Sequence, residues 1–130
     1  MESCPNIILN SDASENVAYN ITNFPAYIKK GQLSSYPDFR AVSHWHDDFE
    51  FILILDGQMS YDINGHKISL QTGEGIFVNS RCFHYGYSDS HTECIFICIP
   101  LSPQLLSTNN YFVENYLNHL VQNTNFPYQK

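Results

Sequence analysis

The side chains with the clearest capacity for chemistry in this chain are His44, His46 and Glu50, which lie within one short segment. In an extended strand, side chains at positions i, i+2 and i+6 point to the same face, so these three are predicted to face a common interior. If a neighbouring strand brings His84 alongside them, three imidazoles and one carboxylate surround a single pocket. Such groups bind divalent transition metals, with Zn, Ni, Mn or Fe as candidates. His44, His46, Glu50 and His84 are therefore the candidate metal ligands.

The same pocket could instead bind an organic ligand without metal, through hydrogen bonds to its polar groups. Arg40 shares the strand parity of His44 and His46, and a guanidinium suits a carboxylate, a phosphate or a sugar hydroxyl. Arg81 precedes His84 in a turn, where it either covers the mouth of the pocket or stays at the surface. The predicted ligand-binding residues are Arg40, His44, His46, Arg81 and His84. No catalytic residue is predicted, because no further general acid or base is evident beside the motif.

Short β-strands are the elements that must position these residues. Between Val17 and Pro100, runs of Val, Ile, Phe and Tyr alternate with turn residues, a pattern typical of an all-β barrel or sandwich. The predicted strands span residues 17–22, 26–30, 41–46, 49–55, 59–63, 67–71, 75–79, 82–87 and 92–99. Asn64-Gly65 predicts a hairpin turn. The strand over 49–55 is apolar on both faces, so we expect it to be central.

The two ends of the chain differ from this middle region. Residues 1–15 are polar and rich in turn formers, which predicts an N-terminal arm, and residues 16–100 are assigned to the barrel. Residues 101–130 are assigned to a linker and a C-terminal amphipathic helix from about Asn110 to Asn123. The apolar residues that recur there at helical spacing are Phe112, Val113, Tyr116, Leu117, Leu120 and Val121.

Composition excludes some classes of function. The formal net charge is −7 with only six Lys and Arg in 130 residues, so this segment is not expected to bind nucleic acid by neutralising phosphates. No secretory signal and no apolar stretch of about 20 residues is present, which predicts a cytoplasmic protein without a membrane span. Four scattered cysteines fit reduced thiols, and Cys94 and Cys98 are interpreted as small core residues.

The motif spacing resembles that of a known family. The two histidines with Glu50 and Gly57 resemble the first conserved motif of the cupin superfamily, and Gly73 with His84 resembles the second. This resemblance implies a jelly-roll β barrel, whose metal is bound by the three histidines and the glutamate. The sequence departs from the motifs at Asp38, Asn79 and Arg81, where a glycine, a proline and a glycine are usual. Relatives with such departures often bind organic ligands directly.

Within that superfamily, residues 38–100 resemble the N-terminal sensor domain of AraC-type transcription regulators, through segments 44–57, 61–70 and 73–84. The resemblance implies a homodimeric domain that binds a small-molecule effector, with sugars as one candidate class. DNA would then be contacted only through a C-terminal domain with two helix-turn-helix units, which this chain lacks. We expect the chain to be part of a longer regulator. The alternative is a stand-alone metal-dependent cupin enzyme, a dioxygenase or an isomerase.

Overall fold

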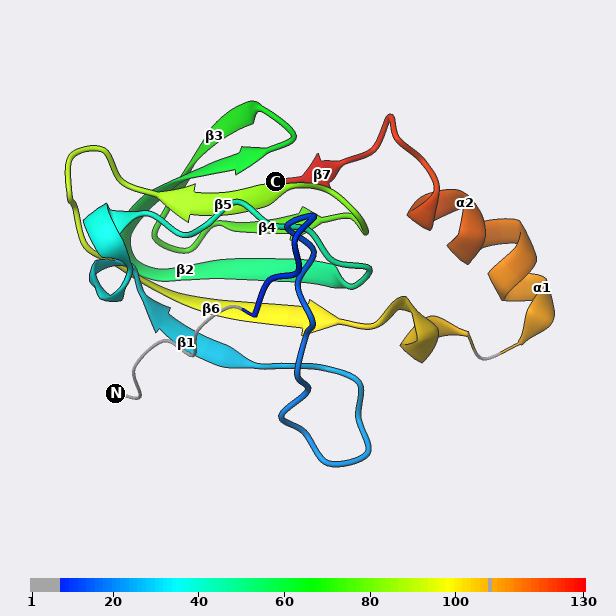
Figure 1. Cartoon of the computed structure of the whole chain (residues 1–130). Helices are drawn as coiled ribbons and strands as arrows, with labels where there is room; N and C mark the ends of the chain where they lie inside the picture. The colour runs from blue at the N-terminus through cyan, green and yellow to red at the C-terminus, as the bar shows by residue number, and fades with distance from the viewer. Residues whose placement is uncertain (1–7, 108) are drawn as a thin grey trace.

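One long strand, β2 (Phe49–Ile63), takes part in both sheets of the barrel. The computed structural model describes residues 8–107 and 109–130, so most of the first half of the predicted arm lies outside the described residues. The remaining strands are β1 (Lys29–Gln32), β3 (His66–Gln71), β4 (Gly75–Val78), β5 (His84–Tyr87), β6 (Cys94–Leu101) and β7 (Tyr128–Gln129) (Figure 1). The helical turns are η1 (Leu33–Ser35), η2 (Pro37–Phe39), η3 (Pro103–Leu106), α1 (Asn110–Phe112), η4 (Val113–Leu117) and α2 (Asn118–Val121). The predicted all-β class is confirmed.

The two halves of β2 have different partners. Its first half pairs with β6 and β4, in the strand order β1-β6-β2-β4-β7, and its second half pairs with β3 and β5. The strands predicted over 49–55 and 59–63 are therefore one continuous strand. The change of partners follows a bulge between Ile54 and Asp56, and Gly57 there adopts a φ of +86°. A bulge of this kind bends a strand and increases its twist, so β2 can pass from one sheet to the other.

Side chains of β2 alternate between the barrel interior and the outer surface. Ile52 and Ile54 are buried in the core, together with residues of the neighbouring strands such as Val78 and Phe96. Phe51 and Leu53 point outward and are 41% and 42% exposed. The strand is central in its hydrogen bonding, as predicted, but its outer face is only partly covered by the other described residues.

Two predicted strands do not form. Residues 17–22 contain only an isolated bridge between Ile21 and Phe24, because the side-chain amide of Asn20 replaces a ladder there. This amide donates to the carbonyl of Ile28 and accepts from its N–H, at 2.8 and 2.9 Å. Residues 41–46 are extended but pair only at single points. The strand predicted over 26–30 is displaced to β1.

The C-terminal helix runs from Asn110 to Val121, close to its predicted bounds, with a π-helical turn in its middle. Leu117 is its buried residue, whereas Tyr111 and Tyr116 are exposed. The side-chain amide of Asn79, at the end of β4, donates to the carbonyls of Leu120 and Phe126, at 2.8 and 3.0 Å. This contact ties the helix end to the barrel. None of the helices among the described residues has the length and apolar character needed to cross a membrane.

The change of partners in β2 depends on Gly57, and Gly73 provides a matched control. Both have a φ near +85°, but a Cβ on Gly57 would overlap the carbonyl oxygen of Glu93, whereas one on Gly73 meets open space. We expect Gly73→Ala to cost about 1 kcal/mol of unfolding free energy, through backbone strain alone. Gly57→Ala should cost about 3 kcal/mol or more, because overlap adds to the same strain. Urea denaturation measures both, and equal losses would contradict this account of the bulge.

Candidate functional site

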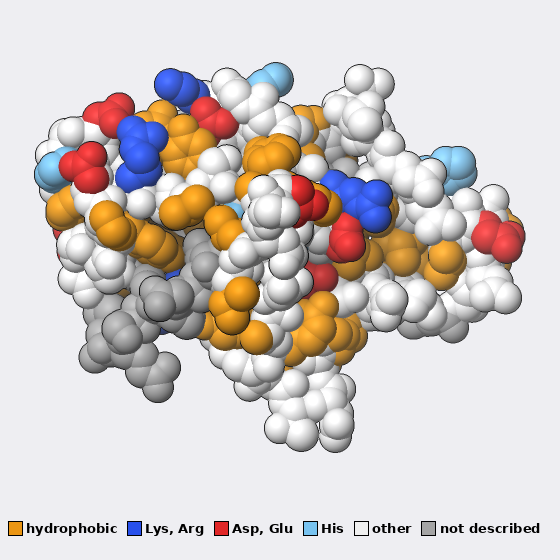
Figure 2. All heavy atoms as spheres, viewed as in Figure 1, with side chains coloured by type: hydrophobic (Ala, Val, Ile, Leu, Met, Phe, Trp, Pro, Cys, Tyr) orange, Lys and Arg blue, Asp and Glu red, His pale blue; other side chains and the backbone are white. Residues whose placement is uncertain are grey.

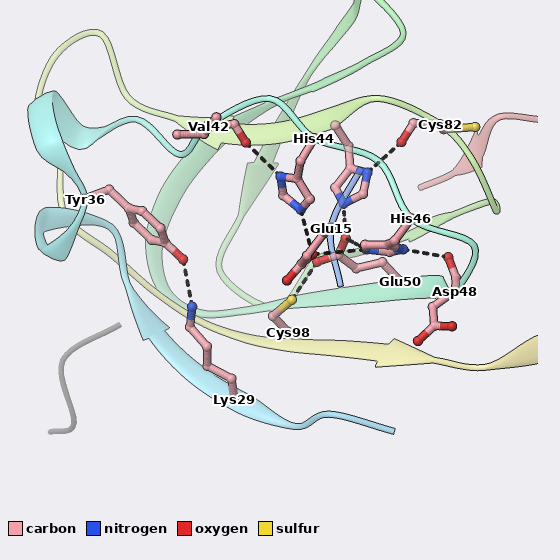
Figure 3. A network of polar contacts seen from close by, with 11 residues as sticks. Glu15, Lys29, Tyr36, Val42, His44, His46, Asp48, Glu50, Cys82 and Cys98 are labelled. Atoms are coloured by element: carbon pink, nitrogen blue, oxygen red, sulfur yellow. Dashed lines mark hydrogen bonds and ion pairs between the residues drawn. The ribbon is translucent and has the colours of Figure 1, made fainter. Parts of the chain in front are cut away.

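The four predicted metal ligands come together inside the barrel. The candidate ligand atoms of His44, His46, Glu50 and His84 all lie within 4.8 Å of one another, and all four residues are buried. Figure 3 shows the labelled members of this cluster pointing toward one another. The cluster is assembled from the segment before β2, from β2 itself and from the start of β5.

Backbone pairing brings His84 to the other histidines. The N–H of His44 donates to the carbonyl of His84, and the N–H of His84 donates to the carbonyl of His44, at 3.3 and 2.9 Å. Residues that exchange both hydrogen bonds in an antiparallel pair present their side chains on the same face. The single bridge in the segment predicted as strand 41–46 is therefore enough to complete the cluster.

Each imidazole is oriented by a hydrogen bond from its Nδ1 to a carbonyl two residues away. The accepting carbonyls are those of Val42 for His44 at 2.7 Å, Asp48 for His46 at 3.0 Å, and Cys82 for His84 at 2.8 Å. A carbonyl oxygen only accepts, so each Nδ1 carries the hydrogen. In a neutral imidazole the lone pair then lies on Nε2, which points into the cluster. When all three imidazoles are neutral, three lone pairs and one carboxylate therefore converge.

This donor set fits a divalent metal ion. The Nε2 atom of His84 is buried and makes no hydrogen bond within the described part of the chain, although it closely contacts Oε2 of Glu50. The same oxygen lies 3.3 Å from Nε2 of His46. Lone-pair donors held this close call for a proton or a cation between them. A bound metal would be held by three Nε2 atoms and Glu50, and would supply Lewis acidity at the cluster.

The titration of these groups follows from burial and mutual charge. Burial disfavours ionised Glu50, but the neighbouring His84 and His46 outweigh it and hold the pKa of this carboxyl well below its usual range. Burial, and next the charge of His84, lowers the pKa of His44 to about 4. Burial acts the same way on His46, but contact with Glu50 and then the charge of Glu15 raise its pKa on balance. His44 is therefore neutral at pH 7, as metal binding requires.

A small inner cavity of about 60 Å³ lies beside the cluster. Cys98 lines this cavity, and its thiol donates to Oε1 of Glu50 at 2.6 Å. Burial and the adjacent Glu50 raise the pKa of this thiol, so it stays protonated and able to donate. Lys29, on another wall, donates to the hydroxyl of Tyr36 at 2.8 Å. Cys98 was interpreted from the sequence as a core residue, but here it contacts a predicted metal ligand.

A larger outer cleft of about 930 Å³ opens at the other side of the cluster. His46 and Arg81 line it, and Nε of Arg81 lies 2.6 Å from Oδ1 of Asp47. Arg40 lies elsewhere, paired with Asp89 at 2.9 Å and packed over the ring of Tyr87. The structure thus brings His44, His46, Glu50 and His84 together, places Arg81 at the cleft, and leaves Arg40 apart from both spaces.

The surface in Figure 2 shows few basic side chains, set among apolar and acidic ones. The exposed side chains of both Arg40 and Arg81 are paired with acidic residues. The face in view therefore shows no cluster of unpaired basic side chains.

Glu15 is a site residue that the sequence analysis missed. Its Oε2 atom lies 3.4 Å from Nε2 of His44 and 3.9 Å from Nε2 of His46. Burial raises the pKa of this carboxyl, with opposing effects from the nearby histidines. Glu15 lies in the region predicted to be an arm, far from the motif in sequence, so no spacing pattern pointed to it.

Comparisons with known proteins agree with this fold. The sequence profile of the cupin domain matches residues 28–100, more than half of the chain. An uncharacterised HTH-type transcriptional regulator of Bacillus subtilis, YdeC, is 27% identical over 123 residues, covering 95% of this chain and 42% of YdeC. The chain therefore spans less than half the length of that relative.

Two solved structures illustrate the shared fold. A cupin-like protein of Thermotoga maritima matches with a TM-score of 0.56 and 18% identity, over 64% of this chain and 62% of that one. The polyketide cyclase RemF of Streptomyces resistomycificus matches with a TM-score of 0.53 and 18% identity, over 61% and 56%. At these identities the matches concern the fold alone.

Metal content tests the cluster directly. We expect protein purified without chelator to contain about one metal ion per chain, and His84→Gln to retain less than about 0.2, because a ligand is lost. The exposed His66 offers a matched control, and His66→Gln should retain the full content. Elemental analysis provides the measurement. A metal content that is the same in both variants would show that the cluster is not the binding site.

The pKa of His44 predicts a pH dependence for the metal-free protein. Between pH 6.5 and about 4 the unfolded chain protonates this residue and the folded chain does not, so stability falls as pH falls. From pH 7 to pH 5 the loss due to His44 is about 2 kcal/mol. Urea denaturation should therefore show a smaller acid-induced loss in His44→Asn than in the unaltered protein. The raised pKa of His46 has the opposite effect on stability as pH falls, but His46 is present in both proteins and does not distinguish them. An equal loss in both would contradict the assignment.

Proposed function

We propose that this chain, which belongs to the cupin family, is the small-molecule-sensing domain of an AraC-type transcription regulator. In this role the barrel binds an effector and controls an attached DNA-binding domain. The similarity to YdeC, which is described as an HTH-type transcriptional regulator, supports a regulatory role. The observation that most supports the proposal is that the outer cleft is lined by both the barrel and the C-terminal helix.

The walls of the outer cleft come mainly from four separate parts of the chain. They are the N-terminal segment at Glu15–Tyr19, the barrel mouth around His46 and Arg81, the turn at Ser102–Gln104, and the end of the C-terminal helix at Val121–Thr124. A ligand in this cleft would contact the barrel and the helix at once. Its binding energy would then favour one arrangement of these parts over others, which is the physical requirement for a sensor.

Size also favours the outer cleft as the effector site. The inner cavity of about 60 Å³ has room for about two water molecules. The outer cleft of about 930 Å³ lies within the range of about 300 to 1,000 Å³ that small-molecule sites occupy. We therefore place the effector in the outer cleft, with His46 and Arg81 among its contacts. Sugars, which present many hydroxyls, are one candidate class.

Asn79 supplies a mechanical link between the site and the helix. Asn79 is buried, at 3% exposure, and its side-chain amide donates hydrogen bonds to the carbonyls of Leu120 and Phe126. It also lies close in sequence to Arg81 and His84. A proline, usual at this position in the motif, could not make these bonds. A shift at the barrel mouth would therefore be passed to the helix end, after which a DNA-binding domain would follow.

The proposal includes a homodimer in the cytoplasm. The outward-facing Phe51 and Leu53 of β2, and Tyr111 and Tyr116 of the helix, are exposed within the described part of the chain. Exposed apolar groups of this kind are suited to a subunit interface. DNA would be contacted only by the additional domain.

A metal-dependent enzyme is the second candidate function. The buried cluster of three histidines and Glu50 beside a cavity is the observation that favours it. Within the inner cavity, Tyr61 is the buried candidate for an acid, but burial and Glu50 raise its pKa well above the usual value. A group so weakly acidic is poorly matched to proton transfer at neutral pH, so sensing is preferred.

The extent of the reading frame that encodes this chain distinguishes the regulatory function from the enzymatic one. We expect the frame to continue beyond Lys130 into a domain with two helix-turn-helix units, because sensing without an output domain has no effect on transcription. The full-length protein should bind a DNA fragment from its own upstream region, with an affinity that changes when a panel of pentoses and hexoses is added. A frame that ends at Lys130 would contradict the regulatory role and favour the enzyme.

A further inference from the structure

We propose that Glu15 is an exchangeable fifth metal ligand, carried by the N-terminal segment, so that metal binding docks this segment on the barrel. The inference goes beyond the sensing role. It depends on metal binding by the cluster, which elemental analysis tests separately. The assignment rests on the position of the carboxylate, on how its segment is held, and on the two spaces that it separates.

The position of Glu15 matches that of a metal ligand. Its Oε2 atom lies 3.4 Å from Nε2 of His44 and 3.9 Å from Nε2 of His46. Two atoms each bonded to one ion at about 2.1 Å are separated by about 3 to 4 Å. The Nδ1 of His44 donates to the carbonyl of Val42, so its Nε2 is the ring nitrogen that faces Glu15. A cation bound to both atoms would account for a half-buried carboxylate directed at this nitrogen.

The segment around Glu15 is a compact turn that is bonded to Trp45. Its tight turn is closed by its own side chains, such as Ser14 bonding to Asp12, and it joins the barrel mainly through Trp45. The N–H of Glu15 donates to the carbonyl of Trp45 at 2.8 Å, and the N–H of Trp45 donates to the carbonyl of Ala13 at 3.2 Å. The indole of Trp45 donates to the carbonyl of Asp12 at 3.1 Å. These three bonds to one residue would break if the segment left the barrel.

Glu15 also separates the two spaces at the site. It lines both the outer cleft and the inner cavity, and no other residue among those described lines both. Figure 3 shows it beside His44 and Glu50, in the middle of the polar network. Displacing its carboxylate would therefore join cleft and cavity and free a coordination position. A ligand with a carboxylate could then take that position.

Hydrogen exchange of the N-terminal segment tests the proposal, with Zn(II) alone as the probe. In the unaltered protein, saturating Zn(II) should slow exchange in peptides covering residues 8–16 by about tenfold or more, because the docked segment opens less often. In Glu15→Gln, Zn(II) should still bind at one per chain, about tenfold more weakly, and should leave this exchange unchanged. Fluorescence of Trp45, the single tryptophan, should respond to Zn(II) only in the unaltered protein.

Glu114→Gln is the matched control, since Glu114 is an exposed glutamate of the C-terminal helix, and it should behave as the unaltered protein does. Equal slowing by Zn(II) in Glu15→Gln would overturn the proposal. Faster exchange in that variant by the same factor with and without Zn(II) would also overturn it, because Glu15 would then only stabilise the segment. If Zn(II) does not bind the unaltered protein at all, the proposal fails together with the metal site, while the sensing role is still tested by the reading frame.

Discussion

The site depends on three hydrogen bonds from imidazole Nδ1 atoms to backbone carbonyls two residues away. Each bond fixes the hydrogen on Nδ1 of its histidine and directs Nε2 toward the cluster. The tautomer and the ring orientation are therefore set before any ligand binds. The carbonyls of Val42 and Cys82 precede their histidines by two residues, and that of Asp48 follows His46 in a bend. The cluster is thus a consequence of local backbone geometry as much as of side-chain identity.

The long strand β2 supplies the rigid frame for this arrangement. Glu50 near its start is held between β4 and β6, while Ile63 at its end pairs with His84, so a single element fixes the carboxylate and the last histidine. The bulge before Gly57 lets the two halves belong to different sheets. A straight strand would place these two ends in one plane and would not enclose a pocket.

Much of this was predictable from residue types and spacing. His44, His46 and Glu50 share strand parity, and the motif spacing identified His84, so the cluster could be named in advance. The segment 41–46 was predicted as a strand, yet parity holds there because extended backbone alternates its side chains even without a ladder. Glu15 could not be found in this way, since its contacts depend on tertiary folding of a polar segment. The strand at 17–22 failed because Asn20 bonds Ile28 with its side chain, which apolar patterning does not report.

The placement of Glu15 between cleft and cavity has a kinetic consequence. If a ligand can take the coordination position of Glu15 only after this segment lifts, its observed association rate would level off at the opening rate instead of rising with ligand concentration. Release would be governed by the same step, so a ligand bound at that position would have a long residence time even at modest equilibrium affinity. Occupancy of the site would then depend on earlier as well as present ligand concentrations, over the timescale of local opening.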